Sequence, residues 1–223
     1  YESSLGLVGS EMCIRDRYYW GQNIMTNSGM NLIRKKINKM PFGSVFVISD
    51  FTDVAEYINV KKCLQRLEKE GIVRRIIRGV YDKPYFSKVL NEHAAPNIEL
   101  VAKAIARNFN WVIAPGGLTS LNLLGLSTQV TNSYVFYSSG QYKTYEIGKI
   151  TIYFKHKSSK ELLNLSYKSS LVVNAIKELR HSLPEQTIIM IRNRLSDSER
   201  NKLLIEASGV TKWIYEIIKK VCN

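Results

Sequence analysis

The fold of the N-terminal half is decided by one continuous stretch, VFVISDFTDVAEYINVKKCLQRLEKEGIVRRIIRGVYDKP (45–84). It opens with a short β-branched and aromatic run, which predicts a strand. Two consecutive capping residues, Ser49 and Asp50, then mark the start of a helix. A second helical pattern follows Asn59 and ends at Gly71, a residue type that often terminates helices. The first of these helices is expected to carry its apolar side chains at Phe51, Val54, Ala55 and Ile58.

The second helical pattern has two chemically different faces. Apolar side chains recur at steps of three and four residues, which is typical of a helix that packs on one side. Beyond Gly71 the period changes to that of extended chain, and Arg78-Gly79 supplies a turn between two strands. The apolar face consists of Val60, Cys63, Leu64 and Leu67, and the opposite face carries Lys61, Lys62, Gln65, Arg66 and Lys69.

Upstream of this stretch, residues 29–40 form another helical pattern, which Pro41 and Gly43 end. The order is therefore helix, strand, two helices and a hairpin, which is the order of a winged helix-turn-helix. We expect such a DNA-binding domain over residues 28–87. The inward side chains of the first helix are expected to be Leu32, Ile33, Ile37 and Met40.

A winged helix-turn-helix places its second helix in the major groove, where side chains read base edges, while other cations hold the phosphates. Residues 28–86 contain 12 Lys+Arg and 6 Asp+Glu, a net charge of +6. A basic helix face is often only solvated, but here the cations gather on the helix and the hairpin together. The predicted DNA-binding residues are Lys61, Lys62, Gln65, Arg66, Lys69, Arg74, Arg75, Arg78 and Lys83.

Composition agrees with a polyanionic partner. The 223 residues carry a net charge of +13, which favours nucleic acid before a membrane surface. The three cysteines are too few and too scattered for a disulfide framework. No apolar run approaches the 18 residues or more that indicate a membrane-spanning helix. We therefore expect a cytoplasmic protein of one large or two small domains.

The first residues need separate treatment. The segment SSLGLVGSEMCIRDR (3–17) looks like a translated sequencing-adapter read-through, and it has neither the pattern of a signal peptide nor any periodicity. Residues 1–24 are accordingly expected to be a non-native or disordered extension that contributes nothing to the fold.

The C-terminal half predicts a second domain. A polar stretch without periodicity, residues 88–97, is the expected linker. Residues 98–223 then alternate helical and extended patterns, with strand-like runs at 133–137, 142–147 and 149–155. They predict an α/β domain with a small, mainly antiparallel sheet and a helical tail, in which Ser196 and Glu199 fit a capping box. The whole chain is expected to be α+β.

The sequence offers little for catalysis. The three histidines, His93, His156 and His181, are scattered, and none has metal-ligand spacing. The glycine pair in Pro115-Gly116-Gly117 lacks the Gly-Lys-Ser/Thr of a phosphate-binding loop, so a strand-to-helix turn explains it better. We expect no enzyme activity, no metal and no cofactor.

One alternative partner is single-stranded RNA. Aromatic rings stack on unpaired bases and lysines contact the phosphates, so interleaved aromatic and basic residues suit such a ligand. Alternation on a half-exposed sheet produces the same pattern. The residues concerned are Tyr142, Lys143, Tyr145, Lys149, Tyr153, Lys155 and Lys157.

Two sequence motifs point to a family. They are the basic hairpin with Arg-Gly-Val-Tyr (78–81) and the run from Ile-Ala-Pro-Gly-Gly to Leu-Leu-Gly-Leu-Ser-Thr-Gln (113–129). With them the chain resembles the AbiEi-type antitoxins of bacterial type IV toxin–antitoxin systems, in the branch without an assigned enzymatic activity. The resemblance spans roughly residues 30 to 195, and the helical tail beyond Ser196 lies outside it.

The resemblance implies an antitoxin that represses its own operon and counteracts a nucleotidyltransferase-like toxin, in the setting of abortive infection and phage defence. It also implies that antitoxin and toxin need not form a stable complex. Two alternatives stay open: a free-standing transcriptional regulator whose second domain senses a ligand or dimerises, and an RNA-binding protein.

Overall fold

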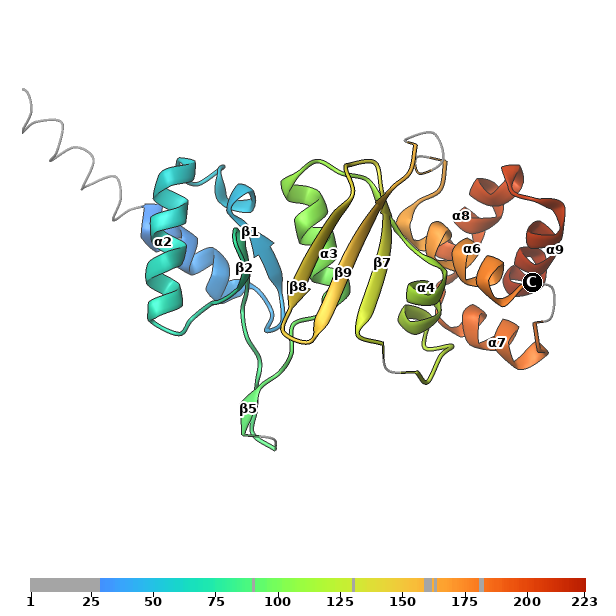
Figure 1. Ribbon diagram of the computed structural model, residues 1–223, viewed down its shortest axis with the longest axis horizontal. Helices are drawn as coiled ribbons and strands as arrows, with labels where there is room; N and C mark the ends of the chain where they lie inside the picture. Colours follow the sequence, from blue (N-terminus) through green and yellow to red (C-terminus); the bar gives the residue numbers. More distant parts are fainter. Residues whose placement is uncertain (1–28, 90, 130, 159–161, 163, 181–182) are drawn as a thin grey trace, which may run out of the picture. The chain divides into compact units, whose positions relative to one another are not determined.

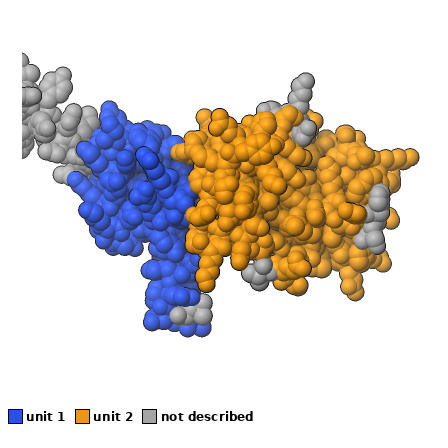
Figure 2. All heavy atoms as spheres, in the orientation of Figure 1, with its two compact units in different colours: residues 1–96 blue, residues 97–223 orange. Residues whose placement is uncertain are grey.

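The computed structural model describes residues 29–223, apart from 90, 130, 159–161, 163 and 181–182 (Figure 1). The expected N-terminal extension, 1–24, therefore lies outside the described residues. The chain divides into two compact units, one ending at Pro96 and the other comprising Asn97–Asn223 (Figure 2). Both units contain helices and small sheets, so the fold is mixed α+β, as the sequence predicts.

Unit 1 contains two of the three helices that the sequence predicts, and the predicted hairpin. Residues 29–39 are helical. In chain order there follow β1 (Val45–Val47), the 3-10 turn η1 (Ile48–Phe51), α2 (Tyr57–Lys69), β2 (Arg74–Ile77) and β3 (Val80–Asp82). The strands form an antiparallel sheet in the order β1-β3-β2. Gly79 makes the tight turn between β2 and β3 with a φ of 85°, a backbone conformation that favours glycine.

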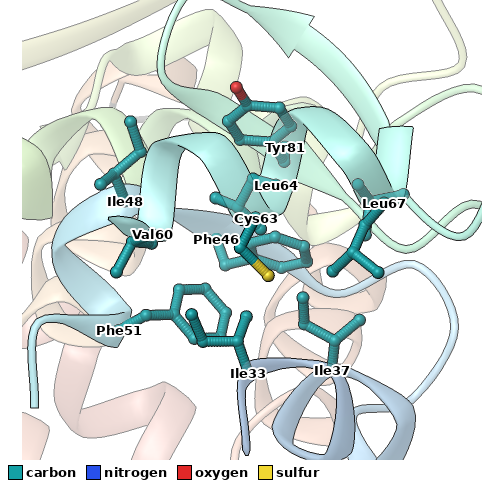
Figure 3. Close-up of a cluster of buried hydrophobic side chains, with 11 residues drawn as sticks. Ile33, Ile37, Phe46, Ile48, Phe51, Val60, Cys63, Leu64, Leu67 and Tyr81 are labelled. Atoms are coloured by element: carbon teal, nitrogen blue, oxygen red, sulfur yellow. The ribbon is translucent and has the colours of Figure 1, made fainter. Parts of the chain in front are cut away.

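The core of unit 1 joins the first helix, the sheet and α2 around a set of buried side chains (Figure 3). Ile33 and Ile37 of the first helix are buried as expected, whereas Leu32 is 51% exposed, so the prediction that it points inward is wrong. The apolar face of α2 is buried in full. The labelled core residues are Ile33, Ile37, Phe46, Ile48, Phe51, Val60, Cys63, Leu64, Leu67 and Tyr81.

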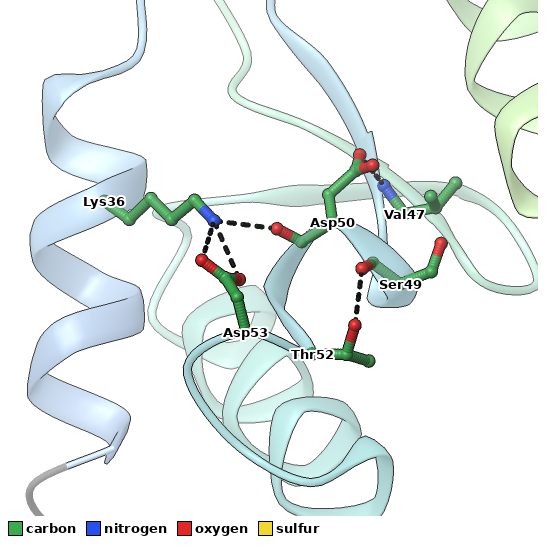
Figure 4. Close-up of polar contacts among 6 residues, drawn as sticks. All are labelled: Lys36, Val47, Ser49, Asp50, Thr52 and Asp53. Carbon is green, nitrogen blue, oxygen red and sulfur yellow. Dashed lines mark hydrogen bonds and ion pairs between the residues drawn. The ribbon is translucent and has the colours of Figure 1, made fainter.

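The first of the two expected adjacent helices is much shorter than predicted. Only the 3-10 turn Ile48–Phe51 forms, because polar side chains bond to the local backbone instead of supporting a helix (Figure 4). The Asp50 carboxylate accepts from Val47 N at 3.0 Å, and Thr52 Oγ1 donates to the Ser49 carbonyl at 2.9 Å. Ile58, assigned to that helix from the sequence, lies in α2 and is 63% exposed.

The segment that follows β3 contains a small hairpin. Strands β4 (Phe86–Ser87) and β5 (Glu92–His93) pair antiparallel. β4 lies just before the residues expected to form the linker, and β5 lies within them. Asn91 takes a φ of 52° in this hairpin, a left-handed conformation that asparagine tolerates better than most residues. A polar, aperiodic stretch thus has more structure than its sequence predicts.

Unit 2 opens with helix and strand elements near their expected positions. They are α3 (Ile98–Asn108), β6 (Ile113–Pro115), α4 (Gly117–Leu124), β7 (Ser133–Ser138), β8 (Lys143–Ile147) and β9 (Ile150–His156). The sheet order is β6-β7-β9-β8. The outer pairs β6–β7 and β8–β9 are antiparallel, but β7 and β9 are parallel neighbours. The sheet is therefore mainly antiparallel with a parallel pair at its centre.

The C-terminal helices of unit 2 pack on one another around a second core (Figure 1). The capping box is confirmed: Glu199 N donates to Ser196 Oγ at 3.3 Å, and Ser196 N donates to Glu199 Oε2 at 2.9 Å. Among the described residues, no helix is long and apolar enough to cross a membrane. The helices are α6 (Tyr167–Leu179), α7 (Glu185–Asn193), α8 (Asp197–Glu206) and α9 (Lys212–Cys222), with the 3-10 turn η2 (Ala207–Gly209) before α9.

Candidate nucleic-acid interface

Helix α2 presents its basic face to solvent. Its apolar residues are buried in the core of unit 1, so the rotation of the helix about its own axis is fixed. The face opposite must then point outward. All five predicted contact residues on α2 are exposed: Lys61, Lys62, Gln65, Arg66 and Lys69.

Strand β2 adds a further cation to this surface. The exposed side chain of Arg75 lines the same open depression as residues of α2, although it lies beyond Gly71 in the chain. The depression contains four cations and one carboxylate, so it attracts anions. Arg78 is also exposed, in the turn between β2 and β3. The residues that line the depression are Lys62, Gln65, Arg66, Glu68, Lys69 and Arg75.

The first helix contacts the C-terminal end of α2 through the side chains of Met30 and Arg34. Arg34 Nη2 forms an ion pair with Glu70 Oε2 at 2.7 Å, just beyond the end of α2. Arg66 Nη1 lies 3.6 Å from the thioether sulfur of Met30. Burial raises the pKa of the Cys63 thiol on the inner face of α2, against the opposing effect of Arg34 and Arg66. This thiol is a packing group and stays protonated at neutral pH.

Two of the predicted DNA-contacting residues, Lys83 and Arg74, direct their side chains to other groups of unit 1. Lys83 is only 9% exposed, and its ammonium donates to the carbonyls of Asn38 at 2.9 Å and Met40 at 2.8 Å. It therefore satisfies carbonyls at the C-terminal end of the first helix, where a cation is also favoured by the helix dipole. The same ammonium lies 4.7 Å from the ring centroid of Phe42.

Arg74 crosses the hairpin to a buried carboxylate. Its guanidinium forms a two-pronged contact with Asp82, Nε to Oδ1 at 3.1 Å and Nη2 to Oδ2 at 2.6 Å, and Nη2 also donates to the Ala94 carbonyl at 3.0 Å. Asp82 is 1% exposed. Arg74 and Asp82 face each other in the β2–β3 register. Arg74 and Lys83 are thus bonded within the unit, and the exposed surface is formed by the other seven predicted residues.

Lys36, on the first helix, also binds within unit 1 (Figure 4). Its ammonium donates to the Asp50 carbonyl at 2.8 Å and to Asp53 Oδ1 at 3.0 Å. It lies 5.2 Å from the centroid of Phe51 as well. These contacts attach the turn η1 to the first helix.

The aromatic and basic residues considered for RNA do not share one surface. On β8, Lys143 and Tyr145 point to the same side of the sheet as Phe154, and the Lys143 ammonium lies 4.4 Å from the centroid of Phe109. Tyr153 and Lys155 alternate with Phe154 on β9 and face the other side. The set is thus divided between two faces, which does not make a continuous stacking platform.

The turn at Pro115-Gly116-Gly117 is occupied by a side chain of the protein itself. A Cβ at Gly117 would overlap the carboxylate of Glu178 on α6, so that carboxylate lies at the N-terminus of α4. An acidic side chain there interacts favourably with the helix dipole. This geometry agrees with a structural turn.

The described histidines have local partners. His156 Nδ1 lies 2.8 Å from the Gly140 carbonyl, and the His93 ring contacts Phe86 at 5.3 Å between centroids. His181 lies outside the described residues. Within the part of the chain that the structure describes, no cluster of three or more His, Cys, Asp or Glu side chains could hold a metal ion.

The chain belongs to the DUF6088 family, a family of unknown function, whose model matches residues 32–203. This match includes most of both units. None of the curated proteins matches the chain.

Among solved structures, the chain is similar to the crystal structure of the RV2827C protein from Mycobacterium tuberculosis, with a TM-score of 0.39 and 10% sequence identity. The alignment covers 89% of this chain and 76% of that one. A likeness this distant assigns no function.

Proposed function

We propose that the chain is a DNA-binding antitoxin that represses its own operon, with unit 1 acting as a winged helix-turn-helix. The topology supports this proposal. Unit 1 has the element order of such a domain, except that the 3-10 turn η1 takes the place of the helix before α2, and its sheet order β1-β3-β2 places the β2–β3 hairpin beside β1. In this proposal α2 is the recognition helix and the hairpin is the wing.

The observation that carries the DNA-binding part is the basic depression between α2 and β2. Its cations come from two elements, so a phosphate backbone and a base edge could be contacted together. Arg66 and Gln65 offer the two-pronged hydrogen bonding that guanine and adenine edges accept. Arg75 and Arg78 are assigned to phosphates. Arg74 and Lys83 are left out of the proposed interface because their donors are bonded within unit 1.

The antitoxin part of the proposal rests on the resemblance to AbiEi-type antitoxins, carried by the hairpin motif (78–81) and the run 113–129. The proposed partner is a nucleotidyltransferase-like toxin encoded next to this chain. No toxin-binding surface is assigned, since proteins of this kind need not form a stable complex with the toxin. The proposed protein is cytoplasmic and not an enzyme.

Fluorescence anisotropy tests the DNA-binding part. The full-length chain is titrated into a labelled duplex from the region upstream of its gene, into a scrambled duplex of equal length, and into single-stranded RNA of the upstream sequence. We expect a preference for the upstream duplex on the order of 1,000-fold over the scrambled one. Log K should fall with log salt by about 0.9 for each phosphate contacted. Equal affinity for both duplexes contradicts the proposal, and a preference for RNA supports the RNA-binding alternative.

Co-expression with the adjacent gene tests the antitoxin part. We expect the full-length chain to restore growth when the neighbouring gene is expressed from an independent promoter. The Lys62→Ala/Arg66→Ala variant should restore growth equally well, because repression no longer matters in that arrangement. If the wild-type chain gives no rescue, the chain is better explained as a free-standing regulator.

A further inference from the structure

Helix α2 exposes an apolar side chain near its N-terminal end. Ile58 is the second residue of this helix and is 63% exposed. The sequence assigns Ile58 to a core, but the core of unit 1 lies on the other side of the helix. An isolated isoleucine is common on protein surfaces and indicates nothing by itself. What distinguishes Ile58 is its position relative to the basic face of α2.

The buried face of α2 fixes the direction in which Ile58 points. Val60, Cys63, Leu64 and Leu67 are all buried in the core of unit 1 (Figure 3). An α-helix turns once in about 3.6 residues, so each residue is rotated by about 100° from the one before it. By this rotation Ile58 points roughly opposite to the centre of the buried face. Its side chain is therefore at the outermost line of the helix.

Ile58 continues a stripe of residues that line the basic depression. Lys62, Gln65 and Lys69 line the depression, and they follow Ile58 at four, seven and eleven residues along α2. Residues with these spacings lie on one face of a helix. Ile58 is the apolar member of this stripe and lies one turn N-terminal to Lys62. The exposed face of α2 thus presents one apolar side chain in line with three polar ones.

The charges beside Ile58 select the kind of partner. Among the described residues that line the depression, four are cationic and one is a carboxylate, so the surface attracts a polyanion. An apolar protein surface that covered Ile58 would also remove water from Lys62 one turn away, and burying an unpaired charge is costly. A DNA groove avoids this cost because phosphates lie beside the bases. Duplex DNA therefore suits the stripe better than an apolar protein partner.

The chemistry of the major groove identifies the group that Ile58 can contact. The base edges there present hydrogen-bond donors and acceptors, and among the four standard bases thymine also carries a methyl group at C5. The isoleucine side chain has neither donor nor acceptor, so the thymine methyl is its favourable contact. The N-terminal residues of a recognition helix are those that reach base edges in the groove. Ile58 is such a residue of α2.

We propose that Ile58 recognises a thymine of the operator through contact with its 5-methyl group in the major groove. The inference rests on the proposed function, because it takes α2 as the recognition helix. It adds an apolar contact to an interface that otherwise consists of cations and an amide. The operator should accordingly contain a T·A pair whose methyl group contributes to affinity separately from its hydrogen-bonding groups.

Deoxyuridine tests this contact. A U·A pair keeps every hydrogen-bonding group of a T·A pair and lacks the 5-methyl group. The full-length chain is titrated by fluorescence anisotropy into the upstream duplex and into duplexes in which each thymine is replaced singly by deoxyuridine. We expect at least one replacement to raise the Kd about threefold to tenfold, which is the effect of losing one or two buried methyl groups. An unchanged Kd for every replacement overturns the proposal.

The Ile58→Ala variant assigns the contact to this residue. It should bind the thymine duplex and the sensitive deoxyuridine duplex with equal affinity. Alanine is the better helix former and Ile58 is mostly exposed, so the melting temperature should not fall. The matched control is Ile205→Ala on α8, where the isoleucine is 76% exposed, and it should keep the wild-type ratio of the two Kd values. The assignment is wrong if Ile58→Ala still discriminates, or if the control does not.

The same titrations separate a failure of this inference from a failure of the proposed function. If the upstream duplex binds no more tightly than the scrambled duplex, the proposed DNA recognition fails, and the role of Ile58 fails with it. If the upstream duplex is preferred but deoxyuridine has no effect at any position, only the role of Ile58 is overturned.

Discussion

Replacing both Lys62 and Arg66 by alanine is expected to weaken binding to the upstream duplex by about 100-fold or more. Both side chains are exposed on α2 and line the basic depression. Each base contact in a protein–DNA interface contributes about 1–3 kcal/mol, and each 1.4 kcal/mol is about a tenfold change in affinity. Anisotropy at constant salt measures the loss. Arg66→Ala alone should relax the preference at one base position, whereas Arg78→Ala should weaken all duplexes alike.

The control for this prediction is Lys149→Ala/Lys155→Ala. It removes the same two charges, from exposed positions on the sheet of unit 2. A purely long-range effect of net charge would weaken binding equally in both variants, and that result would remove α2 from the interface. Stronger weakening in the control than in the α2 variant would move the nucleic-acid surface to unit 2.

The largest effect on stability is expected for Arg74→Ala, at about 3–5 kcal/mol of unfolding free energy. The substitution leaves the Asp82 carboxylate, which is 1% exposed, without its cation. Asp82 is the buried member of the pair, whereas the Arg74 side chain is 32% exposed. Removing the partner of a buried charge leaves that charge uncompensated and costs about this amount. Urea unfolding monitored by circular dichroism measures the change.

The neighbouring residue on β2 supplies the control. Arg75 is exposed, so Arg75→Ala should change stability by no more than about 0.5 kcal/mol. The double variant Arg74→Met/Asp82→Leu should recover most of the loss, because replacing both charges with apolar groups is often neutral. If Arg74→Ala is as stable as Arg75→Ala, the pair does not contribute as described.

Periodicity explains why much of unit 1 was predictable. The apolar spacing of Val60, Cys63, Leu64 and Leu67 specifies both the helix and the face it buries, and all four residues are buried. The turn at Gly79 follows from glycine's tolerance of positive φ. The short turn at η1 was not predictable in the same way. Side chains such as those of Asp50 and Thr52 can either cap a helix or form hydrogen bonds with the nearby backbone, and the sequence pattern is similar in both cases.

The pairing of strands explains most of the features of unit 2 that the sequence did not predict. The strands β7, β8 and β9 were located to within a residue or two, but the sequence does not reveal that β9 inserts between β7 and β8. Strand neighbours depend on contacts across the whole sheet, which local patterns do not encode.

The sequence predicts the exposure of some of the candidate interface residues but not the internal bonding of others. Exposure of the basic face of α2 follows from its own periodicity, whereas the positions of Lys83 and Arg74 depend on partners in other elements. Lys83 bonds to carbonyls more than 40 residues earlier, and Arg74 reaches a carboxylate on the adjacent strand. A count of basic residues cannot separate such internal cations from exposed ones.

The hydrogen bonds and ion pair that hold the hairpin within unit 1 reduce the conformational entropy that it would lose on binding a ligand. Arg74 ties β2 to β3, and Lys83 ties the chain after β3 to the end of the first helix. The hairpin therefore has little conformational freedom left to lose when a ligand docks against it. Ordering of interface segments normally subtracts from affinity, and a segment fixed beforehand avoids that loss. The two internally bonded cations would then contribute to binding without touching the ligand, by restricting the free protein to the conformation that the complex requires.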